Sequence, residues 1–215
     1  MVPSKVRVTE IFHSIQGESL SAGERTAFVR LTGCPLRCTY CDTAYAFKGG
    51  AWHGIPTILE QISDYGVRQV CVTGGEPLAQ GGCLDLLAAL CDAGYGVSLE
   101  TSGALDVGRV DPRVVKILDL KTPGSGEQQR NLLRNLEYLS ARDQVKLVIC
   151  DEADYHWSAS LVLEHGLHER CTVLFSPMTP GCPPGDLADW ILRDRLPVRL
   201  QIQLHKVLWG EAQGR

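Results

Sequence analysis

Three cysteines lie within eight residues, at Cys34, Cys38 and Cys41, in the spacing CxxxCxxC. One loop could turn all three thiols toward a common centre, and thiolates are preferred ligands of iron–sulfur clusters and zinc. A structural zinc site usually takes four protein ligands, which here would require His53 or the poorly placed Asp42. Three thiolates on a cubane of four irons instead leave one iron open to a small molecule. The spacing therefore favours an iron–sulfur cluster, with zinc as the alternative.

The other six of the nine cysteines are scattered along the chain. We expect them to be small packing side chains or loop residues without a chemical role: Cys71, Cys83, Cys91, Cys150, Cys171 and Cys182. An odd number of cysteines rules out complete intramolecular disulfide pairing. Because residues 1–5 lack the apolar core of a signal peptide, we expect a cytoplasmic protein in a reducing compartment.

The composition limits the partners of the chain. Its 215 residues suit a single domain, 1–215. The 21 Lys and Arg residues against 25 Asp and Glu residues give a formal net charge of −4, which argues against a protein that coats nucleic acid. No apolar run is long enough to cross a membrane. We therefore expect neither nucleic acid nor a membrane as a partner.

Strand and helix patterns alternate after residue 24, which predicts parallel βαβ units. The predicted strands are 25–32, 69–73, 96–100, 114–119, 144–149, 172–175 and 199–203, and the predicted helices are 57–65, 84–93, 128–139, 152–165 and 186–193. Thr57 and Glu60 form a capping-box pattern for the first helix, and four leucines on one face support the helix 128–139. Because a closed eightfold barrel typically needs about 250 residues, we predict an incomplete α/β barrel, with a doubly wound open sheet as the alternative.

Polar clusters follow the predicted strands at their carboxyl ends, which is the edge where parallel α/β folds build their sites. They are residues 33–34, 73–77, 100–103, 119–122, 176–179 and 205–206. Strand ends commonly carry turn residues, so each cluster alone is weak. Together they indicate an enzyme.

The CxxxCxxC spacing, with Tyr40 before its last cysteine, resembles the signature of radical S-adenosylmethionine enzymes. Residues 74–77, Gly-Gly-Glu-Pro, follow a predicted strand and resemble the methionine-binding motif of those enzymes. Four further segments are similar to the 7-carboxy-7-deazaguanine synthase family: residues 10–19, 41–43, 100–103 and 203–206. The resemblance covers essentially the whole chain.

This resemblance implies a partial TIM-like β/α barrel of the radical SAM type. It implies a lyase that converts 6-carboxy-5,6,7,8-tetrahydropterin to 7-carboxy-7-deazaguanine with loss of ammonia, a step of queuosine biosynthesis. A [4Fe–4S] cluster, catalytic S-adenosylmethionine and Mg²⁺ are the implied cofactors, with a flavodoxin-type reductant and a second copy of the chain as partners. Residues 1–24 are then an extension that packs on the barrel and contributes to the substrate site.

The matching motif positions assign roles to individual residues. Cys34, Cys38 and Cys41 match the cluster ligands, and Thr43 matches a Mg²⁺ ligand. Cofactor contacts fall on Tyr40, Asp42, Gly75, Glu76, Asp119, Leu120, Lys121, Ser176, Pro177, Met178 and Thr179. Substrate contacts fall on Ile15, Gln16, Gly17, Glu18, Arg30, Thr73 and His205. A guanidinium suits the substrate carboxylate, and an amide and a carboxylate suit the edge of the pterin ring.

The chain departs from the family pattern in three places. Ser19 stands where the family usually has glycine, and residues 121–123 replace a common Ser-Pro-Lys run. The chain also continues to Arg215, past the His-Lys pair at which some members end near the substrate. A glycyl-radical-enzyme activating enzyme shares the cysteine and glycine motifs and is the enzymatic alternative. A non-catalytic iron–sulfur or zinc protein is the alternative from another class.

Overall fold

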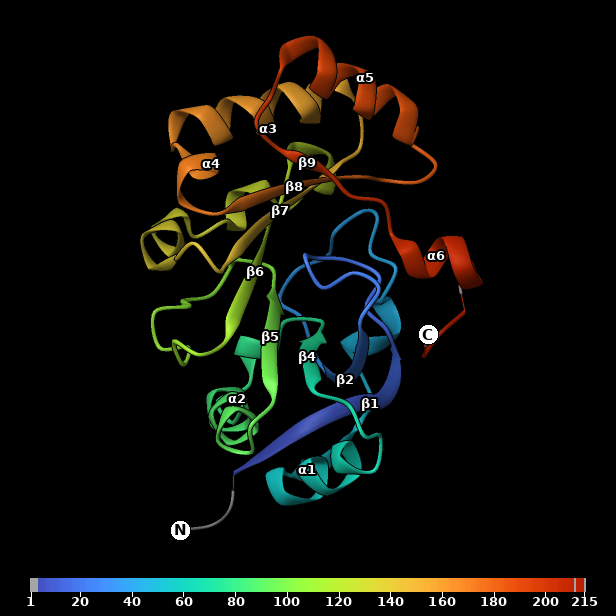
Figure 1. Ribbon diagram of the computed structural model, residues 1–215, viewed down its shortest axis with the longest axis vertical. Coiled ribbons are helices and arrows are strands. Elements are labelled where there is room, and N and C mark those ends of the chain that lie inside the picture. The colour runs from blue at the N-terminus through green and yellow to red at the C-terminus, as the bar shows by residue number, and fades with distance from the viewer. Residues whose placement is uncertain (1–3, 211, 215) are drawn as a thin grey trace.

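The computed structural model describes residues 4–210 and 212–214, so residues 1–3, 211 and 215 of the predicted domain 1–215 lie outside the described part. Within the described residues, one nine-stranded sheet has the order β3-β1-β2-β4-β5-β6-β7-β8-β9 (Figure 1). Its strands are β1 Lys5–Ile15, β2 Arg25–Leu31, β3 Ala51–Gly54, β4 Gln69–Gly74, β5 Gly96–Thr101, β6 Val115–Leu120, β7 Gln144–Ile149, β8 Thr172–Pro177 and β9 Arg199–Leu200.

The sheet is parallel from β2 through β4 to β9, and the first strand joins it antiparallel to β2 and β3. β3 and β9 lie at opposite ends of the strand order and do not pair, so the sheet stays open. The predicted incomplete barrel is thereby confirmed. All parallel strands direct their carboxyl ends to the same edge, which is where the predicted polar clusters lie.

Helices cover the outer face of the curved sheet (Figure 1). They are α1 Ile55–Ser63, α2 Cys83–Asp92, α3 Glu152–Glu164, α4 Leu167–Arg170 and α5 Pro184–Asp194, whereas α6 Leu204–Trp209 lies beside the cavity on the other face. The first five contribute apolar side chains to one core that they share with the strands. No described helix is long and apolar enough to cross a membrane.

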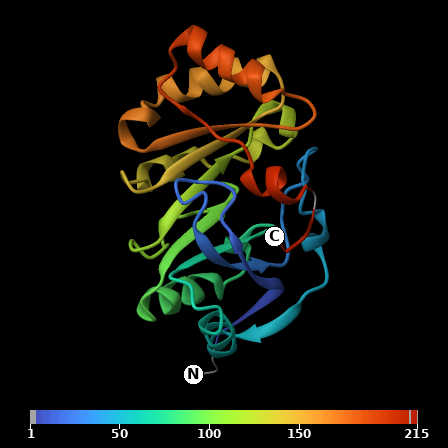
Figure 2. The same ribbon diagram turned by 45° about the vertical axis from the view of Figure 1, so that its right-hand side comes forward.

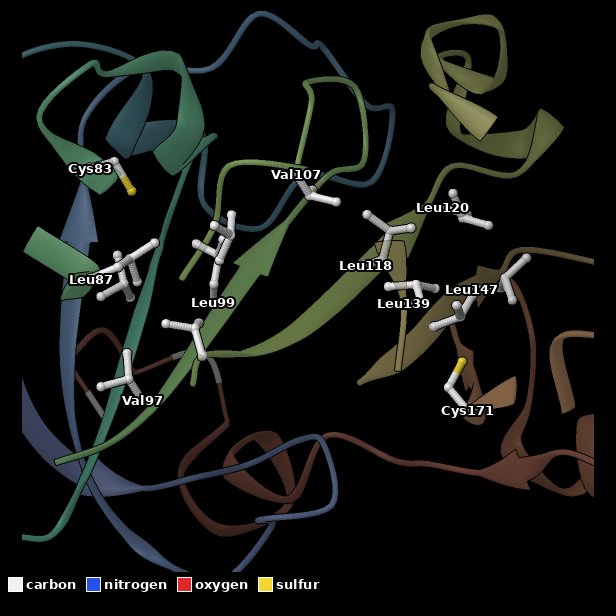
Figure 3. Packing of buried hydrophobic residues seen from close by; sticks show 14 of the residues in the cluster. Cys83, Leu87, Val97, Leu99, Val107, Leu118, Leu120, Leu139, Leu147 and Cys171 are labelled. Carbon is white, nitrogen blue, oxygen red and sulfur yellow. The ribbon is translucent and has the colours of Figure 1, made fainter. Parts of the chain in front are cut away.

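The two faces of the sheet differ in character because successive strand residues point to opposite sides. In β7, Val145 and Leu147 are fully buried in the core, whereas Lys146 and Val148 line a cavity on the other face. Figure 3 shows core leucines of three neighbouring strands, among them Leu147, packed together. The core face stabilises the fold, and side chains on the opposite face are available to bind ligands.

The region predicted as the helix 128–139 is not an α-helix, and that prediction was wrong. It forms two short 3₁₀ helices, Gln128–Arg130 and Leu133–Tyr138. Between them, the Asn131 side chain exchanges two hydrogen bonds of 2.8 Å with the backbone of Lys121. Asn135 is fully buried and donates to the carbonyls of Gly103 and Leu105. These asparagine bonds tie the segment to the β5 and β6 loops and override its leucine periodicity.

Two other expectations needed correction. The first helix begins at Ile55, two residues earlier than predicted. Its N-cap is Gly54, which has no side chain that could cap the helix. Pro56 occupies its first turn, where a missing N–H costs nothing, so the predicted capping box is not used. The last predicted strand, 199–203, is only Arg199–Leu200, and the chain then turns into α6.

The N-terminal segment and the C-terminal helix meet, although the chain separates them. The Leu204 N–H donates to the Gly17 carbonyl at 2.9 Å. Gln201 accepts from the Ser19 N–H and donates to the Ser19 carbonyl. Figure 2 shows α6 beside the N-terminal part of the chain. This contact closes one side of a cavity at the carboxyl ends of the parallel strands.

Candidate functional site

One cavity of about 250 Å³ opens at the carboxyl ends of the parallel strands. Its walls come from the ends of β2 and β4 to β8, from residues 15–18, from the cysteine loop 34–43, and from residues 203–206. Groups far apart in the sequence thus share one space. This is the convergence that the strand-end clusters predicted.

The cysteine loop, residues 34–43, brings its three cysteines to the wall of the cavity. Cys34, Cys38 and Cys41 are partly exposed, line the cavity and form no disulfide. The loop is held from its other side by Thr39, whose Oγ1 donates to the Gly124 carbonyl at 2.8 Å and whose N–H donates to the Ser125 carbonyl at 3.0 Å. A fixed backbone therefore presents unbridged thiols, as a cluster-binding loop requires.

The three cysteines supply thiolate donors, which suit an iron–sulfur cluster or zinc. Burial raises the pKa of the Cys34 and Cys38 thiols, and nearby Lys121 opposes that rise at Cys38. Metal binding takes cysteine as the thiolate and releases these protons. Among the described residues, no three His, Cys, Asp or Glu side chains converge closely enough to hold one metal ion. His53, the alternative zinc ligand, lies in β3 and does not line the cavity.

The glycine motif after β4 packs directly against the start of the cysteine loop. A Cβ on Gly75 would lie 2.3 Å from the Gly33 carbonyl oxygen and 2.7 Å from the Cys34 Cβ. Glycine is thus required for the two loops to approach each other. The Glu76 side chain turns away from the cavity and is fully buried, accepting from Thr101 Oγ1 at 2.9 Å. Its carboxylate also accepts from the Ser102 N–H at 2.7 Å.

A small polar group follows the last cysteine of the loop. Thr43 Oγ1 donates to Asp42 Oδ1 at 2.8 Å, and Lys206 of α6 lies 3.2 Å from Asp42 Oδ2. Although burial acts in the other direction, the bond from Thr43 and the charge of Lys206 lower the pKa of Asp42. The carboxylate is therefore ionised beside the cavity.

Another wall of the cavity, adjoining the cysteine loop at Lys121, carries a buried charge network. Lys146 Nζ lies 2.6 Å from Glu18 Oε2 and 3.3 Å from Asp119 Oδ2, and Lys121 Nζ lies 2.9 Å from Asp119 Oδ1. Gln203 donates to the second Glu18 oxygen at 2.6 Å. Burial acts against ionisation, but these pairings lower the pKa of Glu18 and Asp119 and raise the pKa of Lys146 and Lys121. All four groups are charged.

A further cation, Arg30, enters the cavity from β2. Its Nε donates to Glu10 Oε1 at 2.7 Å, and its guanidinium lies over the rings of Phe12 and Tyr45. Burial disfavours the charge, but Glu10 raises the pKa of Arg30. The Glu10 contact uses only the Nε edge, and the other guanidinium nitrogens supply further donors.

The segment 15–18 is seated by the C-terminal residues. A Cβ on Gly17 would lie only 2.0 Å from His205 Nδ1, so the imidazole packs where any larger residue would project. Thr73, which also lines the cavity, donates to Glu100 Oε2 at 2.8 Å.

Gln16 Nε2 and the Tyr40 hydroxyl are buried without a hydrogen-bond partner among the described residues, and both residues line the cavity. Buried polar atoms are normally paired, so these two atoms indicate that a ligand completes the site.

Nearly all predicted site residues line this one cavity, including Ile15 and the strand-end residues Ser176, Pro177, Met178 and Thr179. The side chains of Glu76 and Leu120 do not, because Glu76 is bonded to the β5 loop and Leu120 belongs to the core. Figure 3 shows Leu120 on the core side.

Sequence reasoning missed Lys146, Glu100 and Gln203, which also line the cavity. Lys146 had a readable signal, because it is the one charge in the otherwise apolar core of β7, Val145–Ile149. Glu100 and Gln203 stand in segments that carried the family resemblance, but their residue types gave no reason to prefer them to their neighbours.

Residues 28–120 match the Radical SAM superfamily. The chain is 46% identical over 97% of its length to the 7-carboxy-7-deazaguanine synthase of Chlorobaculum tepidum, of which it covers 97%. It is 40% identical to the enzyme of that name from Koribacter versatilis, with 95% of this chain and 97% of the relative aligned. The crystal structure of QueE from Escherichia coli matches with a TM-score of 0.76 at 22% identity, covering 94% of this chain and 95% of that one, which supports the fold.

The open barrel, the three-thiol loop and the superfamily match define a radical S-adenosylmethionine enzyme, a class that uses a [4Fe–4S] cluster and S-adenosylmethionine. Within that class, the near full-length relatives are decisive. The chain belongs to the 7-carboxy-7-deazaguanine synthase family.

Proposed function

We propose that the cavity converts 6-carboxy-5,6,7,8-tetrahydropterin to 7-carboxy-7-deazaguanine with loss of ammonia, a step of queuosine biosynthesis. The observation that carries the proposal is the composition of the cavity, with unbridged thiols on one wall and paired buried charges on the other. The whole chain, 1–215, acts as one radical SAM domain. Residues 1–24 supply part of the substrate wall in this proposal, and residues 15–18 carry that role.

The thiol wall, which consists of the cysteine loop 34–43 and the adjoining Gly75, binds the cofactors in this proposal. The three cysteines ligate a [4Fe–4S] cluster, and Gly75 allows close backbone approach to the methionine part of S-adenosylmethionine. When bound, the cluster and S-adenosylmethionine supply the one-electron chemistry that starts the reaction, and S-adenosylmethionine is regenerated. Further cofactor contacts are assigned to Tyr40, Asp42 and residues 176–179, and also to Asp119 and Lys121 at the end of the charged wall that adjoins the cysteine loop. For Glu76 and Leu120, whose side chains face away, only a backbone contact fits the proposal.

The charged wall, which consists of Arg30 and the network of Glu18, Asp119, Lys121 and Lys146, binds the substrate. Arg30 presents its free donors to the substrate carboxylate, a pairing that can be bidentate. Glu18 is an ionised acceptor for the N–H groups of the pterin edge, and Gln16 Nε2 is an unpartnered donor beside it. His205 and Thr73 complete this side of the cavity.

The proposal includes a Mg²⁺ ion with Thr43 as its protein ligand. The ion takes oxygen donors and retains several waters or substrate oxygens, so a single hydroxyl is an adequate protein contribution. The ionised Asp42 beside Thr43 adds favourable negative charge. The family resemblance further supports a cytoplasmic homodimer that takes electrons from a flavodoxin-type reductant.

An anaerobic assay tests the proposal. Reconstituted protein is incubated with 6-carboxy-5,6,7,8-tetrahydropterin, S-adenosylmethionine, Mg²⁺ and a reductant, and both products and cofactor are quantified. We expect 7-carboxy-7-deazaguanine with S-adenosylmethionine largely unspent. Net consumption of S-adenosylmethionine without deazaguanine would contradict the proposal and favour a glycyl-radical-enzyme activating enzyme. Uptake of zinc but not of iron and sulfide would favour the non-catalytic alternative.

A further inference from the structure

Lys146 occupies an unusual place for a lysine. It lies in the middle of β7, directly opposite Asp119 of β6 in the parallel register. Its neighbours Val145 and Leu147 are fully buried in the core, so its own side chain projects into the cavity. Only 13% of that side chain is exposed. A lysine this buried needs anionic partners.

Those partners come from two different parts of the site. Lys146 bonds Glu18 of the N-terminal segment and also approaches Asp119 at the end of β6. Lys121 holds the other oxygen of Asp119. The four groups therefore form two cations and two anions. Asp119 has two lysines, whereas Glu18 has Lys146 as its one direct cationic contact among the described residues.

The loss of Lys146 would consequently act unequally on the two carboxylates. Asp119 would keep Lys121, but Glu18 would keep only the neutral donor Gln203 and the more distant His205. A buried carboxylate without a counter-charge takes up a proton. Its hydroxyl is then a donor, whereas the ionised form only accepts.

We propose that Lys146 is a positioning residue for the substrate, because it holds Glu18 ionised and oriented as an acceptor for the aminopyrimidinone edge of the pterin. This inference rests on the proposed function. The ring N–H and the exocyclic amino group of that edge are adjacent donors. Each Glu18 oxygen spends one acceptor position on Lys146 or Gln203 and retains another for the substrate. Lys146 thus acts through Glu18.

The test is equilibrium binding to the reconstituted protein without reductant, so that no turnover occurs. For Lys146→Met we expect substrate affinity to fall at least about 30-fold while S-adenosylmethionine affinity changes less than about threefold. Lys146→Arg keeps the charge and should recover much of the substrate affinity. In steady-state assays, KM for the pterin should rise while KM for S-adenosylmethionine stays unchanged.

A matched control is Lys116→Met. Lys116 Nζ pairs with Asp143 at 3.0 Å, is comparably buried and does not line the cavity. Its loss should lower the midpoint of thermal unfolding and leave substrate affinity unchanged. If Lys146→Met does not fold, the double variant Glu18→Gln/Lys146→Met decides, since it leaves no uncompensated Glu18 charge. Its substrate affinity should match that of Glu18→Gln alone within about threefold.

Three results would overturn the inference: unchanged substrate binding in Lys146→Met, equal loss of both ligands, or a large further loss when Lys146→Met is added to Glu18→Gln. Failure of the proposed function has a different signature. In that case the unsubstituted protein would bind S-adenosylmethionine but not the pterin.

Discussion

The two walls of the cavity differ in how completely their polar side chains are already paired. On the thiol wall, Cys34, Cys38 and Cys41 are unbridged and partly exposed, in a loop anchored by Thr39 and by the Asp42–Lys206 pair. On the charged wall, Glu18 and Lys146 are nearly buried and already paired. The Tyr40 hydroxyl of this loop is buried without a partner among the described residues, which indicates that an added group completes the first wall. The second wall is preorganised and needs only a substrate of matching pattern.

The backbone supports of the two walls differ in the same way. The charged wall stands on neighbouring strands, with Asp119 and Lys146 opposite each other in register. The thiol wall is a loop whose geometry depends on Gly75 and on bonds from Thr39. Substitutions on the two walls should therefore have separable consequences.

The largest expected effect is that of Cys38→Ala. Loss of one cluster ligand should lower the rate by at least about 1,000-fold, because a step that depends on the cluster has no substitute in the protein. The free energy of unfolding should change by less than about 1 kcal/mol, because Cys38 is partly exposed and lies outside the hydrophobic core. Iron analysis, activity and thermal unfolding measure the three quantities. Global unfolding of the variant would indicate a structural metal instead.

The matched control is Cys171→Ala. This thiol is 7% exposed and belongs to the hydrophobic core. Its loss should keep iron content and activity, and lower the free energy of unfolding by about 1 kcal/mol through lost packing. A loss of iron from this variant would contradict the distinction between cluster-ligand cysteines and packing cysteines.

A smaller effect is expected for Gly75→Ala. The new methyl group would overlap the Gly33 carbonyl and the Cys34 Cβ, forcing the two loops apart. S-adenosylmethionine affinity should fall about 30-fold and the free energy of unfolding by about 1–3 kcal/mol, the usual range for overpacking. Gly81→Ala is the control, because nothing lies within 4 Å of its Cβ position. Equal losses in both variants would mean that the close approach is unimportant.

The smallest effect is expected for Gly17→Ala, on the other wall. The methyl group would displace His205 and loosen the contact between residues 15–18 and α6. Pterin affinity should fall about tenfold with S-adenosylmethionine affinity unchanged, as for a displaced positioning contact. Gly185→Ala, whose Cβ would meet nothing within 4 Å, is the control. An equal loss of S-adenosylmethionine binding would contradict the separation of the walls.

Particular residues show how far the sequence predicts this molecule. The thiol wall was predictable because three cysteines in one loop have few other uses, and strand-end clusters must share one edge of a parallel sheet. The partners within the charged wall were not, because the Lys146–Glu18 pair joins residues that are 128 positions apart. Periodicity also failed where buried asparagines fix the backbone, as Asn135 does in the region predicted as a helix.

The direction of side chains was likewise beyond local reasoning. Glu76 stands in a motif next to the cavity, yet its carboxylate turns to Thr101 and Ser102. Leu120 lies between Asp119 and Lys121, which line the cavity, and strand alternation sends it to the core. A motif therefore indicates which loop serves the site, while the pleat of the strand decides which side chains reach it.

The most direct test of this division is a crossed binding measurement on two variants. Pterin and S-adenosylmethionine affinities are measured anaerobically, without reductant, for reconstituted Cys38→Ala and Lys146→Met. We predict that Cys38→Ala loses the cluster and S-adenosylmethionine binding but keeps pterin affinity within about tenfold, and that Lys146→Met shows the reverse pattern. Loss of both ligands together in both variants would contradict the account.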